Sequence, residues 1–278
     1  MWTPSDRALV GDFGSGQALS NDQFRLLEPL TPPAKAGGGP RKTDMRRMLD
    51  GLFYVVRTGC QWRHLPPPPA FPPWQTVYGY MRAFQKAGVW EAMRHHLLVM
   101  LREQEGREAS PTAAIIDTQS VKTTEKGGIA AMARPTRSGA QTPLRRRDQR
   151  PAAGGLVHAA NLQDADSAGD LLKRIKRLYC WLEVVFANSV CNRLSVLLAC
   201  FLLGLTLIIV RRNARTGFTV LPRRWVVKRT LGRFGRYRRL GRDYEQLPEV
   251  SETMVTLAAI RLRIHRLAHP NRKRLPSP

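Results

Sequence analysis

Apolar residues in the first third of the chain recur at helical spacing and are separated by short breaks. A capping-box spacing from Ser20 to Gln23 predicts a short first helix within residues 20–30. A second helix is predicted after Thr43, which we expect to cap it, and Gly59 ends it. Two further helices are predicted over residues 74–86 and 89–104. Short helices with tight breaks are typical of a helix-turn-helix-like DNA-binding module.

The pattern changes to short β-branched runs that alternate with helices. The run Ile115-Ile116 ends at Asp117, which predicts a buried strand that carries one carboxylate at its end. On this pattern alone, Asp117 could equally be a solvated residue in a turn. The same alternation predicts a strand and a helix from Leu156 onward, a strand over 182–187 and a last helix over 254–267. It predicts an α/β (α+β) domain.

Residues 194–210 form the most apolar stretch, LSVLLACFLLGLTLIIV. At about 17 residues it lies at the lower limit for a membrane span. Gly204 divides it into a helix-like half and a strand-like half. We therefore expect a buried helix followed by a buried strand, with a membrane span as the minor alternative.

Charge narrows the class of partner. The chain has 45 Lys and Arg against 21 Asp and Glu, a formal net charge of +24. Such an excess indicates a polyanion, most often nucleic acid, with a basic membrane-surface protein as the alternative. Four cysteines show no CxxC spacing, and the N-terminus lacks a signal-peptide pattern. We expect a cytoplasmic, nucleoid-associated protein.

Basic residues are densest in 217–245. There Val227, Leu231 and Phe234 form an apolar stripe, while Arg229, Arg233 and Arg236 share another face. A helix of this kind packs on a core and presents Arg to phosphates. The candidate DNA-binding residues of the whole chain are Arg82, Lys86, Lys122, Arg223, Arg224, Arg229, Arg233 and Arg236.

Five segments taken together resemble the family-five transposases of bacterial insertion sequences, a DDE group. They are GLFYVVRTGCQWRHLPP, FPPWQTVYGYMRAF, AAIIDTQSVKTTEKGG, LVHAANLQDAD and FTVLPRRWVVKRTLGRFGRYRRL. The resemblance implies a small helical DNA-binding domain followed by a ribonuclease H-like domain with a mixed sheet and flanking helices. We predict a leader, a helical domain, a ribonuclease H-like domain and a tail, over 1–18, 19–105, 106–269 and 270–278.

The resemblance also implies a catalytic site in which two Asp and one Glu hold two Mg²⁺ ions. These metals would activate water and then the DNA 3′-hydroxyl at the terminal repeats of the element. Asp117 matches the first Asp and is the one metal ligand retained. Asn188 stands where the second Asp is expected, and Lys228, in WVVKRT, stands where the Glu is expected. The partner implied is double-stranded DNA, not a membrane, and a homo-oligomer on DNA is left open.

The two replacements predict an inactive site. Asn188 keeps a carbonyl oxygen without the charge, and Lys228 puts +1 where −1 is expected. One unit-charge pair at about 4 Å is worth roughly 4 kcal/mol at an effective dielectric near 20, so a large loss of rate follows. Two alternatives remain. A working transposase could recruit Glu183, Asp243 or Glu245, and a DNA-binding protein or repressor needs no catalysis.

Residues 129–155 have no helical or strand period, and a loop this long is uncommon inside a compact domain. We expect them to be aberrant or disordered. Family members carry a Gly-Arg-Lys-Arg-His motif here, before a Val-rich strand. Residues 138–143, back-translated with permitted codons and shifted by one base, read Gln-Gly-Arg-Lys-Arg-His. The hypothesis is a frameshift that removes a central strand; a gene whose shifted frame lacks the motif would reject it.

Overall fold

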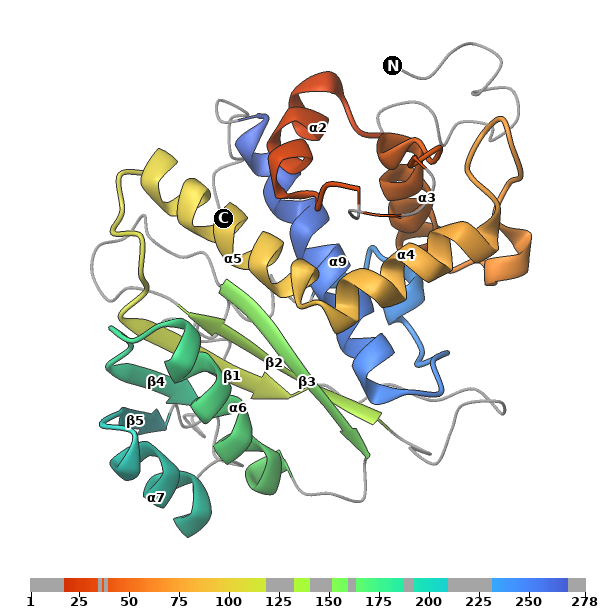
Figure 1. Ribbon diagram of the computed structural model, residues 1–278. Helices are drawn as coiled ribbons and strands as arrows, with labels where there is room; N and C mark the ends of the chain where they lie inside the picture. Colours follow the sequence, from red (N-terminus) through yellow and green to blue (C-terminus); the bar gives the residue numbers. More distant parts are fainter. Residues whose placement is uncertain are drawn as a thin grey trace, which may run out of the picture. The chain divides into compact units, whose positions relative to one another are not determined.

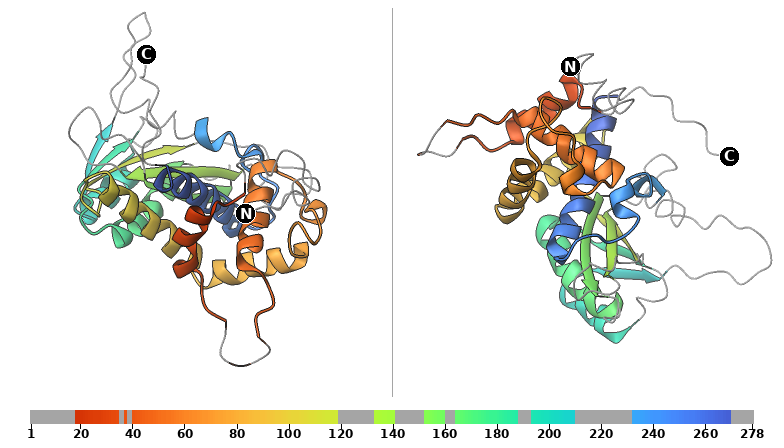
Figure 2. Two further views of the ribbon diagram at one scale, coloured as in Figure 1. Left: turned by 90° about the horizontal axis from the view of Figure 1, so that it is seen from above. Right: turned by 90° about the vertical axis from the view of Figure 1, so that its right-hand side faces the viewer.

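The chain forms two compact units, of which a computed structural model describes residues 18–34, 37, 40–118, 133–140, 152–159, 164–187, 193–209 and 232–269 (Figures 1 and 2). Unit 1 comprises Met1–Arg107 and Leu257–Pro278, and unit 2 comprises Glu108–Thr256. The boundary after Arg107 lies close to the one predicted after residue 105. The C-terminal boundary differs, because the last helix returns to unit 1 instead of ending the second domain.

Unit 1 contains the predicted helices. They are α2 (Asn21–Leu27), α3 (Met45–Thr58), α4 (Trp74–Lys86) and α5 (Val89–Gln104), with short 3₁₀ turns η2 (Glu28–Leu30) and η3 (Trp62–His64). The capping box of α2 is confirmed, since Ser20 Oγ accepts from the Gln23 backbone and Gln23 Oε1 accepts from the Ser20 backbone, both at 3.2 Å. Gly59 ends α3 with a φ of 72°.

One predicted cap is wrong. The N-cap of α3 is Asp44, whose carboxylate accepts from the backbone N–H groups of Arg46 and Arg47. The prediction of Thr43 places the cap one residue too early. Asp carries a charged acceptor at the positive end of the helix, so it is the stronger of the two caps.

The last helix, α9 (Pro248–Leu267), contributes to unit 1 from Leu257 onward. Ile260 and Ile264 are fully buried within it. Arg261 donates from Nη1 to Gln23 Oε1 at 2.7 Å, and its guanidinium lies 5.7 Å from the centre of the Phe53 ring. Arg266 donates to Glu105 Oε1 at 2.7 Å. These contacts join residues that are more than 150 positions apart in the sequence within one helical unit.

Unit 2 is built on a mixed sheet of five strands in the order β3-β2-β1-β4-β5. These strands are β1 (Ala113–Thr118), β2 (Ala133–Ala140), β3 (Ala152–Ala159), β4 (Val184–Ala187) and β5 (Thr206–Ile209). β2 pairs antiparallel with β1 and β3, while β4 pairs parallel with β1 and β5. Helices flank this sheet, so the α/β class and the mixed sheet are confirmed.

Disorder, one of the two expectations for residues 129–155, is wrong for residues 133–140, because β2 occupies a central position in the sheet. The frameshift hypothesis stays a prediction. All eight residues of β2 pair with β3, and five of them also pair with β1. A ladder uses the N–H and C=O groups of the backbone and requires no apolar period. The central strand is therefore not missing. Residues 129–132 and 141–151 lie outside the described residues.

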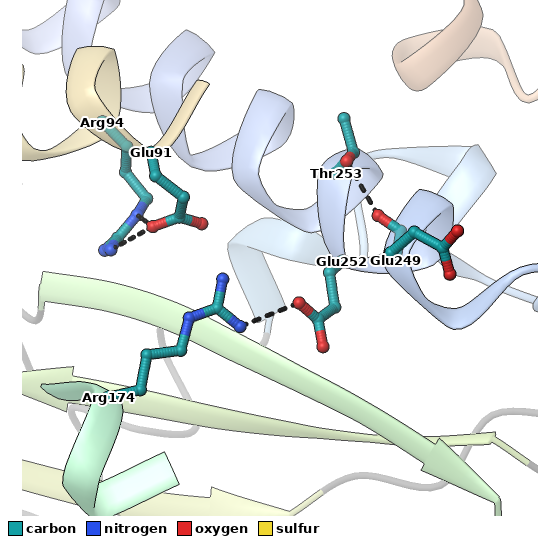
Figure 3. A network of polar contacts seen from close by, with 6 residues as sticks. All are labelled: Glu91, Arg94, Arg174, Glu249, Glu252 and Thr253. Carbon is teal, nitrogen blue, oxygen red and sulfur yellow. Dashed lines mark hydrogen bonds and ion pairs between the residues drawn. The ribbon is translucent and has the colours of Figure 1, made fainter. Parts of the chain in front are cut away.

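Two helices lie beside the sheet, α6 (Asp164–Leu178) and α7 (Leu194–Leu202), and they pack on each other (Figure 1). α6 buries Leu171, Leu172 and Ile175. Arg174 of α6 donates to Glu252, in the unit 2 half of α9, at 2.9 Å (Figure 3). This ion pair fixes α6 against the start of the long helix.

The apolar stretch 194–210 divides as predicted, into α7 and β5 around Gly204, whose φ is 62°. The predicted burial is wrong. α7 buries only Val196 and Cys200, whereas Leu194 and Phe201 are 81% and 80% exposed. No helix among the described residues is long and apolar enough to cross a membrane.

The role of α9 in unit 1 is testable with Ile260→Ala. A cavity at this fully buried position is expected to destabilise unit 1 by about 2–5 kcal/mol. Hydrogen exchange would show it as faster exchange of α3 and α5 amides. The control is Leu262→Ala on the same helix, where the side chain is only partly buried and the effect should be smaller. Unchanged protection of α3 and α5 in Ile260→Ala would contradict the assignment of this helix.

Candidate functional site

The candidate site lies at the edge of the sheet where the parallel strands β1 and β4 end. Their register pairs Ile116 with Ala187. Asp117 is the next residue of β1, and Asn188 follows Ala187 directly in the chain. Carboxyl ends of parallel strands meet at one edge of a sheet, which is where open α/β sheets place ligands. Asp117 and Asn188, the first two of the three positions implied by the resemblance, each follow one residue of the pair Ile116 and Ala187 in the sequence.

Asp117 lies within a strand and not in a turn. It pairs in register with Arg137 of β2, while the adjacent Ile116 is 1% exposed. Ile116 is buried in a strand that lies in the middle of the sheet, with a neighbouring strand on each side. The alternative of a turn at Asp117 is therefore excluded, and the predicted strand is confirmed.

The other residues of the predicted catalytic set lie outside the described residues. Asn188 and Lys228 belong to 188–192 and 210–231, and so nothing is stated of their placement. Among the residues that the structure describes, no group of three or more His, Cys, Asp and Glu side chains could hold a metal ion. The described part of the edge contributes Asp117 alone.

The substitute carboxylate Glu183 lies at the wrong end of the strands. The register pairs Ala113 with Val184, so Glu183 lies level with Thr112, five residues before Asp117. At about 3.3 Å per residue this is roughly 16 Å along the strand. The backbone of Glu183 donates to the Thr112 carbonyl at 2.8 Å. One ion cannot bind both carboxylates in this arrangement.

The two other substitutes have local partners. Asp243 Oδ1 accepts from Ser251 Oγ at 2.7 Å and from the Glu245 backbone at 3.2 Å. Glu245 is held by Arg239, whose Nη2 lies 2.7 Å from Oε1. Both carboxylates thus stabilise the segment that leads into α9, where Asp243 and Arg239 are buried.

The described members of the predicted DNA-binding set divide between the units. Arg82 and Lys86 lie one turn apart on α4 of unit 1, and Arg82 donates to Gln85 Oε1 at 2.7 Å. In unit 2, Arg233 is partly buried and Arg236 is exposed, beside the buried Phe234. Nothing is stated of Lys122, Arg223, Arg224 and Arg229, which lie outside the described residues.

Several positive charges are buried, which the composition did not reveal. Arg94 is 2% exposed, and its Nε and Nη2 donate to Glu91 Oε2 at 3.0 and 2.7 Å (Figure 3). Arg102 is 1% exposed. The available signal was a Glu three residues before an Arg on the apolar face of a helix. Such arginines stabilise the helical unit and are not offered to DNA.

The adjacent histidines of α5 are not arranged as a metal site in the described residues. Burial lowers the pKa of His95 below its ordinary value, and the positive charge of Arg94 and the neighbouring His96 lower it further. His95 is therefore neutral near pH 7. It belongs to the packing of α5, as its position among the buried Arg94 and Leu98 indicates.

Comparison with known proteins finds relatives among bacterial insertion elements. Residues 19–94 match the family described as "Putative transposase of IS4/5 family". The chain is 29% identical over 143 residues to the "Insertion element IS402 uncharacterized 16.2 kDa protein" of Burkholderia cepacia, covering 48% of this chain and 96% of that protein. A structural comparison pairs it with the catalytic domain of Mos1 mariner transposase at a TM-score of 0.31 and 8% identity, covering 67% of this chain and 95% of that one. A score of this size carries no argument, whereas the two sequence matches do. The chain is therefore similar, over its N-terminal part, to putative transposases of the IS4/5 family and to a protein of a bacterial insertion element.

Proposed function

We propose that this chain is a DNA-binding member of the family that does not cleave or join DNA strands. The observation that carries the proposal is the identity of the residues at the three positions that the resemblance assigns to metal binding. Only Asp117 is a carboxylate, whereas the other two positions hold Asn188 and Lys228. Asp117 follows a residue paired with the last residue of β4, which supports its assignment to the first position.

The residue set does not fit a pair of divalent cations. Transposases of this family usually use a divalent metal. Hard cations such as Mg²⁺ take carboxylate, carbonyl and water oxygens. One carboxylate, one amide and one ammonium give a net charge of zero, where two Asp and one Glu would give −3. The strand register also pairs Asp117 with a basic residue, Arg137. We therefore derive no metal-dependent step for this chain.

DNA binding requires none of the altered positions. The family implies it, and the net charge of +24 favours it. Lys86 is exposed on α4, with Arg82 one turn before it, in the unit whose residues 19–94 carry the family match. The DNA proposed is the double-stranded end of an insertion element, within the nucleoid. A protein that binds these ends without cutting them would act as a repressor of transposition, which is the second candidate.

The proposed lack of catalysis can be tested by placing carboxylates at positions 188 and 228. The full chain is expected to show no strand cleavage of element-end DNA with Mg²⁺ or Mn²⁺. The double variant Asn188→Asp with Lys228→Glu is expected to gain metal-dependent cleavage, because it returns the charge set to −3. Products would be measured on sequencing gels of end-labelled duplex.

The control for restored cleavage is Asp117→Ala in the double variant, which should remove the activity again. Restoration could fail for reasons elsewhere in the chain, so wild-type cleavage is the decisive measurement. Robust cleavage by the wild-type chain, abolished by Asp117→Ala, would show that the site works as it stands and would end the proposal.

DNA binding is tested through α4. The variant Arg82→Ala with Lys86→Ala is expected to bind duplex DNA more weakly. Each phosphate contact removed should reduce the steepness of log K against log salt by roughly 0.9, so loss of both contacts should reduce it by about 1.8. Fluorescence anisotropy of the full chain between low and moderate salt measures it.

The matched control is Arg25→Ala on α2, an exposed residue of the same unit whose charge is partly offset by Asp22 at 3.6 Å. Its effect on the slope should be smaller. If both variants change the slope equally, α4 is not a specific contact, and the whole charge of the unit is responsible.

A further inference from the structure

Helix α7 has an apolar stripe that its own unit leaves uncovered. The stripe consists of Leu194, Leu197, Leu198, Phe201 and Leu202, at positions i, i+3, i+4, i+7 and i+8. These spacings place the five residues on one side of the helix. They are 81%, 43%, 53%, 80% and 74% exposed. The opposite side carries Val196 and Cys200, which are buried against the rest of unit 2.

The exposed apolar area of the stripe is large for a protein surface. Four largely or half-exposed Leu side chains and one exposed Phe together present an apolar patch on the order of a few hundred Å². A standard stable interface takes about 800 Å² from each partner. Monomeric proteins seldom leave one contiguous apolar patch as large as this stripe without a function.

The charge of the chain restricts what can cover the stripe. From Leu194 to Ile209 the sequence contains no Lys, Arg, His, Asp or Glu, although the chain carries a net charge of +24. Two copies of such a basic protein repel each other over most of their surface. An uncharged stretch is the place where they can approach at the lowest electrostatic cost. A nucleic acid, by contrast, would find no cation there.

The strand that follows α7 extends this surface. β5 is the last strand in the sheet order, so among the described residues its outer edge has no neighbouring strand. Its sequence, TLII, has neither charge nor Pro, the devices that usually protect an edge from pairing. The edge offers backbone N–H and C=O groups next to the apolar helix with which it packs.

We propose that the α7–β5 surface is the contact through which two copies of this chain associate. The contact is isologous: the α7 stripe of one copy packs against that of the other, around a two-fold axis. This inference concerns unit 2 alone and does not depend on whether the chain cleaves or binds DNA.

The full chain, freed of nucleic acid by nuclease, is examined by analytical ultracentrifugation at micromolar concentration. We expect a dimer that persists or strengthens from low to high NaCl, because salt screens the repulsion and does not weaken apolar contact. The variant Leu198→Glu with Phe201→Glu is expected to be monomeric, with a dissociation constant raised at least about a hundredfold by two charges placed in the contact. Both positions are exposed, so the fold should tolerate them.

The control is Leu247→Glu, a Leu that is 44% exposed in unit 2 but lies outside α7, and it should remain dimeric. Hydrogen exchange on the wild-type chain is a second measurement, in which residues 194–209 should become better protected as protein concentration rises. A monomeric wild-type chain would overturn the proposal, as would a dimer that the double variant leaves intact or that high salt dissolves. Stripe-dependent binding of a monomer to neutral phosphatidylcholine vesicles would also overturn it, in favour of a lipid surface.

Discussion

The parallel pairing of β1 with β4 is the constraint on which the site depends. It joins Ala113 to Val184 at one end and Ile116 to Ala187 at the other. The side chains that hold this pair in the core are apolar, with Ile116, Val185 and Phe186 buried. Burial of apolar surface and backbone hydrogen bonds do not depend on the residues that follow each strand. The pairing of β1 with β4 therefore does not require a particular side chain at position 188.

The positions of most helices and strands could be predicted from the sequence, but their burial and strand pairing could not. The capping residue Ser20, the break at Gly59 and the division at Gly204 are predicted correctly because a local rule governs each of them. The burial of α7 is not, because an apolar run does not show how many elements surround it. β2 was not predicted because its sequence has no alternation of apolar and polar residues. The hydrogen bonds of a strand ladder are made by the backbone and do not require such a pattern. Of the candidate site, the strand position of Asp117 was predictable, whereas the register that excludes Glu183 required the sheet.

The net charge overstates the number of basic side chains that can contact DNA phosphates. Arg94 and Arg239 are buried, and each is paired with a Glu of the same unit. A buried pair costs desolvation and is retained only where both partners are well bonded, so neither Arg is free to contact a phosphate. Exposed residues such as Lys86 and Arg236 remain. Specific DNA contacts are therefore better sought on a few exposed positions than in the total charge.

Loss of catalysis and retention of binding would leave a protein with a definite physical effect. Two DNA-binding units joined through the α7–β5 surface would act as a bivalent ligand. The second unit would then bind at a high effective concentration once the first is on DNA. Occupancy of element ends would rise without any new contact to DNA. The charge-free stripe allows two copies of a chain with a net charge of +24 to approach at a low electrostatic cost.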